Sequence, residues 1–425
     1  MDYHRSLDYL FGLQKFGIKL GLDNIRTLLG RLGSPQLLYP CVHVAGTNGK
    51  GSTAVALAGI LQNSGYRVGL YTSPHLHSFT ERIQVDRQVI SEASVVSITA
   101  RLQGLVTDLP VTFFEMTTAM ALEYFRQAKV DIAILETGLG GRLDATNVVT
   151  PLVSVITPIS YDHAAYLGDD LAAIAAEKGG IIKPGVPVFV ARQKPEALKV
   201  LQRQAHAVAA EIYAADSDWQ IRSGPAGFRF AGLGWNEEVI SGLAGGHQHD
   251  NLGLALAVAA YLQSQGWHVD RSLAVKSLAE LSWPGRLEWW RGEQLLFDAA
   301  HNLAGCQALA DYLTASGLNR VHLVTGFKAD KDWQAMLRVL LPFATRVYVT
   351  KPEVEAVVDP VRVVEFVARR GGAASCHLPA EEALDQAFAV RQPGETIVVA
   401  GSIFLISVLR NQLLKREKEN AESRS

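Results

Sequence analysis

The sequence has few cysteines and no marked excess of charge of either sign. Its three cysteines, Cys41, Cys306 and Cys376, form no C-x-x-C pair, so neither a disulfide framework nor a zinc knuckle is supported, and we expect buried free thiols. The 40 Lys and Arg residues are balanced by 42 Asp and Glu residues. Without a bulk positive charge the protein is not expected to bind nucleic acid, and any anionic ligand must be held locally.

Membrane and export signals are also missing. The longest apolar run, residues 252–262, is about half of the ~20 residues that span a bilayer. The first residues, MDYHRSLDYLFGLQ, lack the basic and apolar stretches of a secretion signal. We therefore expect a cytoplasmic protein with no membrane partner.

The composition is that of a globular α/β protein. Of 425 residues, 48% are hydrophobic and 19% are charged, and the length suggests two or three domains. A β-branched run at 41–45, a glycine-rich loop and a helix at 50–63 begin an alternation of strands and helices, with buried strands at 130–136, 153–159 and 187–191. This pattern predicts a parallel sheet that is covered on both faces.

The alternation breaks at WPGRLEWWR and then begins afresh, which indicates a second domain. We place the linker at 282–292. The predicted fold is a P-loop-containing parallel-sheet ATPase domain with short N-terminal helices, residues 1–285, followed by a smaller Rossmann-like α/β domain, residues 286–425. The polar end of the chain, 415–425, is expected to fray into solvent.

The segment AGTNGKGST, residues 45–53, lies where a strand is predicted to end and a helix to begin. Such a loop can direct backbone N–H groups and the positive end of a helix at a polyphosphate, with Lys50 reaching the terminal phosphates and a hydroxyl binding Mg²⁺. The standard motif has glycine where this chain has Val44 and Ser or Thr where it has Gly51, so the loop is a variant. We expect it to bind ATP, and the alternative is a glycine-rich turn with a chance lysine.

Two other polar residues follow predicted strands. Glu136 ends the strand before GLGGRLDATN, and His163 follows the next strand in ISYDHAAYLG. Ligands of open α/β sheets bind outside such strand ends, so both residues are candidate magnesium ligands. A salt bridge at the rim for Glu136 and a purely structural role for His163 remain open.

Spacing says less about the remaining candidates. Lys178 lies near the end of a helix in AAEKGGIIKPG, which by itself indicates only a solvated lysine. Asp298 and His301 follow a strand in FDAAHN, and Asn251 and Arg286 precede the linker. These positions could reach a nucleotide when the domains close, but on spacing alone ordinary helix capping or packing is the better explanation for each.

In this order the segments closely resemble the folylpolyglutamate synthase and dihydrofolate synthase family, within the Mur ligase superfamily of ATP-dependent amide-forming enzymes. The resemblance spans nearly the whole chain and rests on GTNGKGS, TSPHL, ERI, FFE, GLGGRLDATN, DHAAYLG, EKGGIIKPG, HQHDN, WPGR and DAAHN. Two motifs depart from the family pattern, DAAHN for DGAHN and EKGG for EKAG. Both departures exchange small residues.

The resemblance implies a role for each candidate. The implied ATP contacts are Thr47, Asn48, Gly49, Lys50, Gly51, Ser52, Asn251, Arg286 and Asp298. The implied magnesium ligands are Ser52, Ser73, Glu136, His163 and a carbamylated Lys178. Lys50, Lys178 and His301 are the implied catalytic residues. Thr112, Phe114, Asp144 and Ala145 match pterin contacts, where Phe114 would stack on the ring and Asp144 would bond its polar edge.

The implied reaction uses ATP and Mg²⁺ to activate a folate or dihydropteroate carboxylate as an acyl phosphate, which the amine of L-glutamate attacks. We expect a monomer that carries out both the dihydrofolate synthase and the folylpolyglutamate synthase reactions. The alternatives are a folylpolyglutamate synthase only, a cell-wall Mur-type amino-acid ligase, and a nucleotide-binding regulatory protein without ligase activity. About 45 residues precede the loop, too few for the UDP-binding domain of a cell-wall ligase.

Overall fold

The computed structural model describes residues 2–17, 21–168, 170–224, 227–290, 294–354 and 356–422. The chain divides into two compact units. The first unit consists of residues 1–160, 164–242 and 248–281, and the second of residues 161–163, 243–247 and 282–425. The sequence predicts one boundary between the domains, at 285/286. In the structure, two short segments that precede this boundary, residues 161–163 and 243–247, also belong to the second unit.

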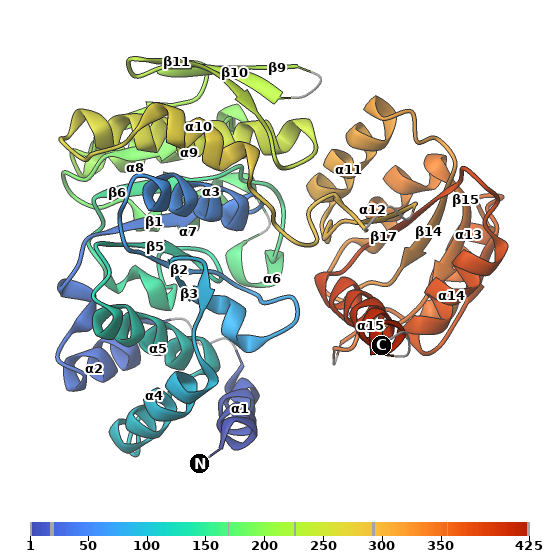
Figure 1. Cartoon of the computed structure of the whole chain (residues 1–425), viewed down its shortest axis with the longest axis horizontal. Helices are drawn as coiled ribbons and strands as arrows, with labels where there is room; N and C mark the ends of the chain where they lie inside the picture. Colours follow the sequence, from blue (N-terminus) through green and yellow to red (C-terminus); the bar gives the residue numbers. More distant parts are fainter. Residues whose placement is uncertain are drawn as a thin grey trace. The chain divides into compact units, whose positions relative to one another are not determined.

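An eight-stranded sheet forms the centre of the first unit (Figure 1). Its strands, in spatial order, are β4 (Gln88–Val89), β3 (Ile83–Val85), β2 (Val68–Tyr71), β5 (Ile132–Glu136), β1 (Cys41–Ala45), β6 (Val153–Ile156), β7 (Val188–Val190) and β8 (Ile212–Ala214). The strands from β2 to β8 in this order pair in parallel, as predicted. The β3–β4 hairpin extends the sheet antiparallel.

Helices cover both faces of this sheet, which confirms the prediction of a sheet buried on two sides. The helices are α1 (Tyr3–Gly12), α2 (Asp23–Arg31), α3 (Lys50–Asn63), α4 (Glu92–Leu105), α5 (Phe113–Ala128), α6 (Ala164–Leu167), α7 (Leu171–Lys178), α8 (Pro195–Ala207), α9 (Gly246–Ser264) and α10 (Arg271–Ala279), with 3₁₀ turns η1 (Leu13–Phe16), η2 (Pro35–Leu37), η3 (Phe79–Arg82), η4 (Ala145–Val148) and η5 (Gly179–Ile181). Ala133 and Leu135 of β5 pack into the core shared with α4 and α5. Helix α3 packs against β1, β2 and β5 from the other face (Figure 1).

The sequence does not predict the second sheet of the first unit. This antiparallel sheet contains β9 (Trp219–Ser223), β10 (Gly227–Gly232) and β11 (Trp235–Ile240). Phe228, Phe230 and Trp235 are buried, while charged residues alternate with them. The sheet packs on α9, where a Cβ at Gly253 would lie 1.9 Å from Ile221 Cδ1. A glycine within the helix therefore makes room for the sheet.

The second unit contains a six-stranded sheet. Its strands, in spatial order, are β12 (Glu288–Trp289), β13 (Leu295–Phe297), β17 (Thr396–Ala400), β14 (Val321–Thr325), β15 (Ala344–Val349) and β16 (Ala374–Cys376). Its helices are α11 (Leu303–Ala315), α12 (Trp333–Leu340), α13 (Pro360–Ala368), α14 (Ala380–Val390) and α15 (Ile403–Glu422), with the 3₁₀ turn η6 (Leu341–Phe343). β12 pairs antiparallel with β13 and the other pairs are parallel. The predicted alternation of strands and helices is confirmed.

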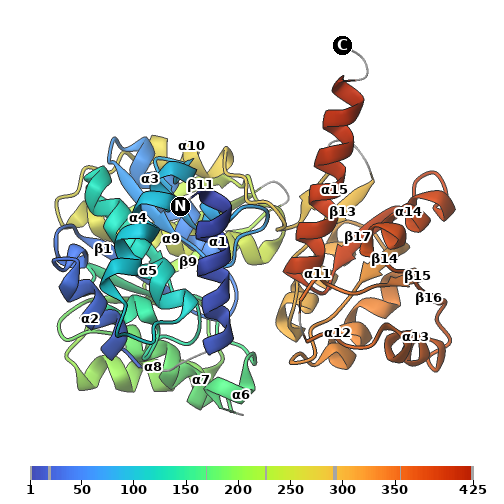
Figure 2. The same cartoon turned by 90° about the horizontal axis from the view of Figure 1, so that it is seen from below.

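Two smaller predictions are wrong. The chain end does not fray from residue 415, because α15 continues to Glu422 (Figure 2), and Arg416 donates two 2.7 Å hydrogen bonds to Asp385 of α14. Cys41 and Cys306 are buried, but Cys376 is exposed, because it ends the edge strand β16.

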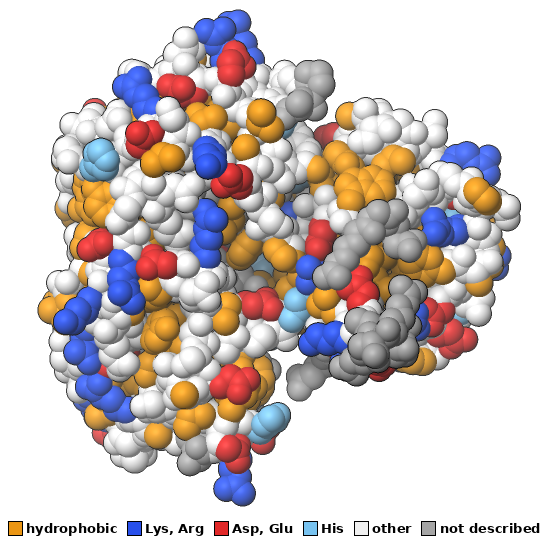
Figure 3. Space-filling model, in the orientation of Figure 1, with side chains coloured by type: hydrophobic (Ala, Val, Ile, Leu, Met, Phe, Trp, Pro, Cys, Tyr) orange, Lys and Arg blue, Asp and Glu red, His pale blue; other side chains and the backbone are white. Residues whose placement is uncertain are grey.

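The surface agrees with the balanced charge of the sequence. Basic and acidic side chains are interspersed on the face of the first unit drawn in Figure 3. Among the described helices, none is long and apolar enough to cross a membrane.

Candidate active site

The glycine-rich loop joins β1 to α3 and is held by backbone and side-chain contacts in the first unit. Gly46 and Gly49 have φ angles of 149° and 85°, which favour glycine. A Cβ on Gly46 would lie 1.9 Å from Thr157 Oγ1, and one on Gly49 would lie 2.2 Å from Asn251 Oδ1. The loop therefore requires glycine at both positions for space as well as for backbone angle.

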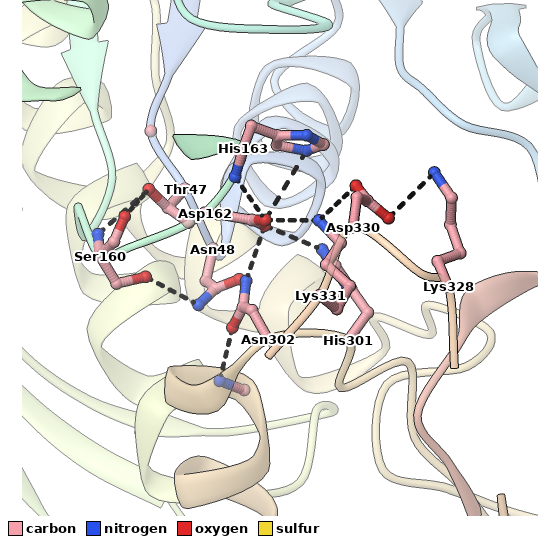
Figure 4. A network of polar contacts seen from close by, with 12 residues as sticks. Thr47, Asn48, Ser160, Asp162, His163, His301, Asn302, Lys328, Asp330 and Lys331 are labelled. Atoms are coloured by element: carbon pink, nitrogen blue, oxygen red, sulfur yellow. Dashed lines mark hydrogen bonds and ion pairs between the residues drawn. The ribbon is translucent and has the colours of Figure 1, made fainter. Parts of the chain in front are cut away.

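The loop is tied to the end of the neighbouring strand β6. The N–H groups of Thr47 and Asn48 donate to Pro158 O, at 3.0 and 3.3 Å. Thr47 Oγ1 donates to Ser160 O at 3.0 Å and accepts from Ser160 N at 3.1 Å (Figure 4). Lys50 Nζ donates to the carbonyls of Gly46 and Thr47, at 3.3 and 3.2 Å. The lysine thus lies over its own loop, where a phosphate would compete for it.

Asn251 is a sequence-predicted residue that meets this loop from a distant helix. Asn251 of α9 is buried, lies against Gly49, and accepts a 3.3 Å hydrogen bond from Thr53 Oγ1 on its carbonyl. Gly51 and Ser52 form the first turn of α3, with Ser52 buried. The structure therefore brings Asn251 to the loop from about 200 residues further along the chain.

Lys178 is not the solvated lysine that spacing alone indicates. It ends α7, as expected, but only 4% of it is exposed, and its Nζ donates to Gly46 O at 2.8 Å. The GLGG loop packs on the same helix end, because a Cβ on Gly141 would lie 2.6 Å from Lys178 O. The glycine there allows the loop to approach the helix backbone.

Glu136 is the last residue of β5. Its partner on the neighbouring strand β1, Val44, lies two residues before the first glycine of the loop. Glu136 is 4% exposed, and its Oε2 accepts a 3.0 Å hydrogen bond from Ser73 N. Glu136, Ser73 and Ser52 offer oxygen donors, which are the ligands that Mg²⁺ prefers. Within the described residues, no cluster of three or more His, Cys, Asp or Glu side chains could hold a metal ion.

The predicted substrate positions surround the start of α5. The Phe114 ring lies 6.0 Å from the Tyr71 ring, and a Cβ on Gly138 would lie 2.5 Å from its Cζ atom. Thr112 caps α5, exchanging hydrogen bonds with Glu115. Ala145, which begins η4, is buried.

Asp144 organises the loop between β5 and η4. Its Oδ2 accepts from the N–H groups of Gly138 and Leu139, at 2.9 and 2.8 Å, and its Oδ1 accepts from the N–H and hydroxyl of Thr146, at 3.0 and 2.5 Å. Burial raises the pKa of Asp144, and these hydrogen bonds oppose the rise. The four bonds use the four acceptor sites of a carboxylate.

The remaining candidates lie in the second unit. Asp298 is buried after β13 and accepts from Leu287 N and Ala300 N, at 2.9 and 3.0 Å. Burial raises the pKa of Asp298, and the charge of Arg286 lowers it. His301 Nδ1 lies 2.9 Å from Ala299 O, and because a carbonyl oxygen only accepts, the ring donates this hydrogen bond from Nδ1.

His163 belongs to a polar network of this unit that the sequence does not predict (Figure 4). At its centre is Asp162, which contacts Lys331 Nζ, accepts from Asn302 Nδ2 at 3.0 Å and lies 3.5 Å from His301 Nε2. Burial alone would raise the pKa of Asp162, but the His301 hydrogen bond and the neighbouring cations hold it far below its usual range. Burial also lowers the pKa of His163, to about 4.

The sequence offers one clue to Asp162, because this residue is adjacent to the candidate His163. It offers no clue to Lys331, whose partner Asp162 lies 169 residues away. The candidates are thus distributed over both units: the loop, Ser73, Glu136, Lys178 and Asn251 in the first, and His163, Arg286, Asp298 and His301 in the second.

Comparisons with known proteins agree with the two α/β domains of this fold. Residues 44–259 match the Mur ligase middle domain, and residues 285–403 match the Mur ligase, glutamate ligase domain. Dihydrofolate synthase/folylpolyglutamate synthase of Bacillus subtilis is 34% identical over 97% of this chain and 99% of its own length. A probable bifunctional folylpolyglutamate synthase/dihydropteroate synthase of Haloferax volcanii is 35% identical over 96% of this chain, which spans 50% of that protein.

The fold is also similar to that of a solved structure over nearly the whole chain. Escherichia coli FolC in complex with DHPP and ADP has a TM-score of 0.90 and 30% sequence identity, over 98% of this chain and 99% of that one.

Proposed function

This chain belongs to the folylpolyglutamate synthase/dihydrofolate synthase family of the Mur ligase superfamily, and we propose that it joins L-glutamate to the carboxylate of a dihydropteroate or folate while ATP is converted to ADP and phosphate. The observation that carries the proposal is the geometry of the glycine-rich loop. Its glycines leave space for Thr157 and Asn251, and Lys50 donates hydrogen bonds to loop carbonyls. The loop leads into α3, so the N–H groups at the start of that helix can receive the phosphates of ATP.

The first step is transfer of the γ-phosphoryl group to the substrate carboxylate. A carboxylate oxygen forms the new bond to phosphorus while the bond to ADP breaks, giving an acyl phosphate. We assign Lys50 to the terminal phosphates, because its present partners are neutral carbonyls that a phosphate would outcompete. The second step is attack of the glutamate amine on the activated carbonyl, with phosphate as the leaving group.

Magnesium would be held by Ser52, Ser73, Glu136 and His163, and would neutralise charge on the transferring group. Glu136 and Ser73 already share a hydrogen bond, so the carboxylate and the hydroxyl-bearing residue are positioned together. Asn251 in the first unit, and Arg286, Asp298 and His301 in the second, are proposed to contact ATP or the reacting groups.

We assign Lys178 as a carbamylated ligand, and its burial supports this. Carbamylation joins the neutral amine to CO₂ and releases a proton, giving a carbamate anion. A side chain that is 4% exposed lies where a localised charge on an ammonium is disfavoured, and a nearby cation would stabilise the carbamate. The hydrogen bond from its Nζ to Gly46 O also supports this role, because it brings the side chain to the glycine-rich loop.

Among the predicted pterin contacts, we propose a different role for Asp144. Phe114 lies against Tyr71 and Gly138 and is proposed to stack on the pterin ring. The Asp144 carboxylate already accepts four internal hydrogen bonds, so we assign it the shaping of the 138–146 loop rather than a bond to the pterin edge. The Thr112 hydroxyl is likewise engaged in its capping box.

A product assay tests the function and its range. Purified protein is given ATP, Mg²⁺ and glutamate with dihydropteroate and tetrahydrofolate in parallel, and products are identified by mass spectrometry. Glutamate addition to both supports the bifunctional enzyme that we propose, and addition to tetrahydrofolate alone restricts it to folylpolyglutamate synthesis. Addition to neither would overturn the proposal, and a UDP-linked cell-wall peptide serves as the control acceptor. Light scattering of the same sample tests the monomer that we propose.

A further inference from the structure

A buried guanidinium without an ion-pair partner lies beside the proposed substrate positions. Arg82 ends η3 and is only 8% exposed. Its Nε donates to His75 Nδ1 at 2.8 Å, and its Cζ lies 5.2 Å from the centre of the Phe113 ring. Across the described ranges, Arg82 has no ion pair with a carboxylate, and the hydrogen bond that its side chain makes is donated by Nε.

The nearest acidic groups are engaged elsewhere. Glu81 accepts from the N–H groups of Leu76, His77 and Ser78, at 2.8 to 3.0 Å, and so holds the 75–82 loop in shape. Glu136 accepts from Ser73 N. Both act on Arg82 only at a distance, and burial has the largest effect, lowering the pKa of Arg82. A guanidinium nevertheless stays charged in proteins, so among the described residues this largely buried cation has no carboxylate to balance it.

His75 supports the cation without competing for an anion. His75 accepts the hydrogen bond from Arg82 Nε at Nδ1, so this nitrogen carries no proton and the ring is a neutral partner of the cation. The Cζ atom of Arg82 lies over the Phe113 ring, which is itself stacked on Phe11 with ring centres 5.5 Å apart. The N–H bonds of the two Nη atoms lie in the guanidinium plane, where a carboxylate can accept two of them at once.

The surroundings specify which anion fits. Phe113, which the Arg82 guanidinium contacts, is followed in the chain by Phe114, the residue proposed to stack on the pterin. Glu136, a proposed magnesium ligand bonded to Ser73 N, is near enough for its charge to act on Arg82. A pteroyl compound is a flat aromatic system that ends in a carboxylate, and that carboxylate must come close to the metal and the γ-phosphate.

We infer that Arg82 binds the acceptor carboxylate of the pteroyl substrate and presents it to ATP, an inference that rests on the proposed function. One carboxylate oxygen forms the bond to phosphorus while the guanidinium holds the other. The cation also offsets repulsion between the carboxylate and the phosphates. In an acceptor that already carries glutamate, the same role falls to the side-chain carboxylate that receives the next residue.

Binding without ATP tests the inference separately from catalysis. Pteroate and its carboxamide, in which the acid is replaced by an uncharged amide, are titrated against the wild type, Arg82→Gln and Arg82→Lys by calorimetry. The wild type should bind pteroate ~10-fold or more tightly than the carboxamide, since a charge-assisted bidentate contact is lost. Arg82→Gln should abolish this preference and leave carboxamide binding within about twofold, with Arg82→Lys intermediate.

Arg87, an exposed arginine of the β3–β4 turn, provides the matched control, and Arg87→Gln should change neither affinity. An equal loss of both ligands in Arg82→Gln would show that Arg82 only packs the loop, and would overturn the inference. If a variant does not fold, the wild-type preference alone decides: equal affinity for pteroate and carboxamide overturns it. A wild type that binds neither compound would overturn the proposed function as well.

Discussion

Removing the carboxylate of Asp162 should destabilise the second unit strongly. The side chains of Asp162 and Lys331 are only 5% and 6% exposed, and they form an ion pair (Figure 4). Asp162→Ala leaves the lysine ammonium buried with Asp330 as its remaining carboxylate, at 3.7 Å. The Asn302 amide also loses its acceptor.

The expected loss follows from these contacts. Breaking a buried ion pair by removing one partner costs about 3 to 5 kcal/mol. Asp330 can recover part of the charge interaction, because its side chain is 41% exposed and free to approach. We therefore expect a loss of about 3 kcal/mol, at the lower end of that range. Lys331→Met should cost a similar amount, and the double variant should cost at least ~2 kcal/mol less than the sum of the two.

Hydrogen exchange followed by mass spectrometry measures this for each unit separately. Amides of α11 and β14 that exchange through opening of the whole second unit should exchange about 10²-fold faster in Asp162→Ala. Amides of β5 and α5 in the first unit serve as the internal control and should change little, because Asp162 groups with the second unit. Additive losses in the double variant, or a loss below about 1 kcal/mol in Asp162→Ala, would refute the assignment of a buried ion pair.

Three further outcomes are expected. Lys50→Ala should lower ligation about 10³-fold or more while leaving the thermal unfolding curve nearly unchanged, and turnover above a tenth of the wild-type value would contradict its assignment to the phosphates. Lys178→Arg should lose about 10²-fold in turnover, because the working group is a carbamate anion; near-normal turnover together with an unmodified amine in a magnesium-loaded crystal structure would reject carbamylation. The stability that Asp162 gives the second unit should depend on pH, because the pKa of this carboxyl is lower in the folded protein than in the unfolded chain. This stabilisation is complete above the unfolded pKa of about 3.9 and is lost as pH falls through the folded pKa. The stability difference between wild type and Asp162→Ala, measured from pH 6 to 2, should therefore shrink only at the acid end, and a constant difference would argue against it.

Local patterns account for much of what could be predicted. The β-branched run before the loop, the glycines within it and the helix from Lys50 are short-range features, and the structure has β1, the loop and α3 where the pattern predicts them. The alternation of apolar strands and helices likewise predicts both parallel sheets, since strands buried on two faces are apolar throughout. The family motifs, taken in order, identify the reaction class.

Other features depend on contacts between distant segments. The sheet β9–β11 was hidden because each strand is short and half polar, and its apolar side is defined only by packing on α9 around Gly253. Spacing placed Lys178 at a helix end, but only the meeting of α7 with the ATP loop buries it against Gly46.

The charged residues show the same division between sequence and tertiary structure. The sequence by itself determined the buried parallel strands, the helices between them and the loop that can receive phosphate, because backbone geometry and side-chain periodicity are local properties. Whether Arg82 lacks an anion, or Asp162 meets Lys331, was decided by the tertiary structure. Burial and ion pairing depend on what the rest of the chain brings to a residue, and no local pattern contains that information.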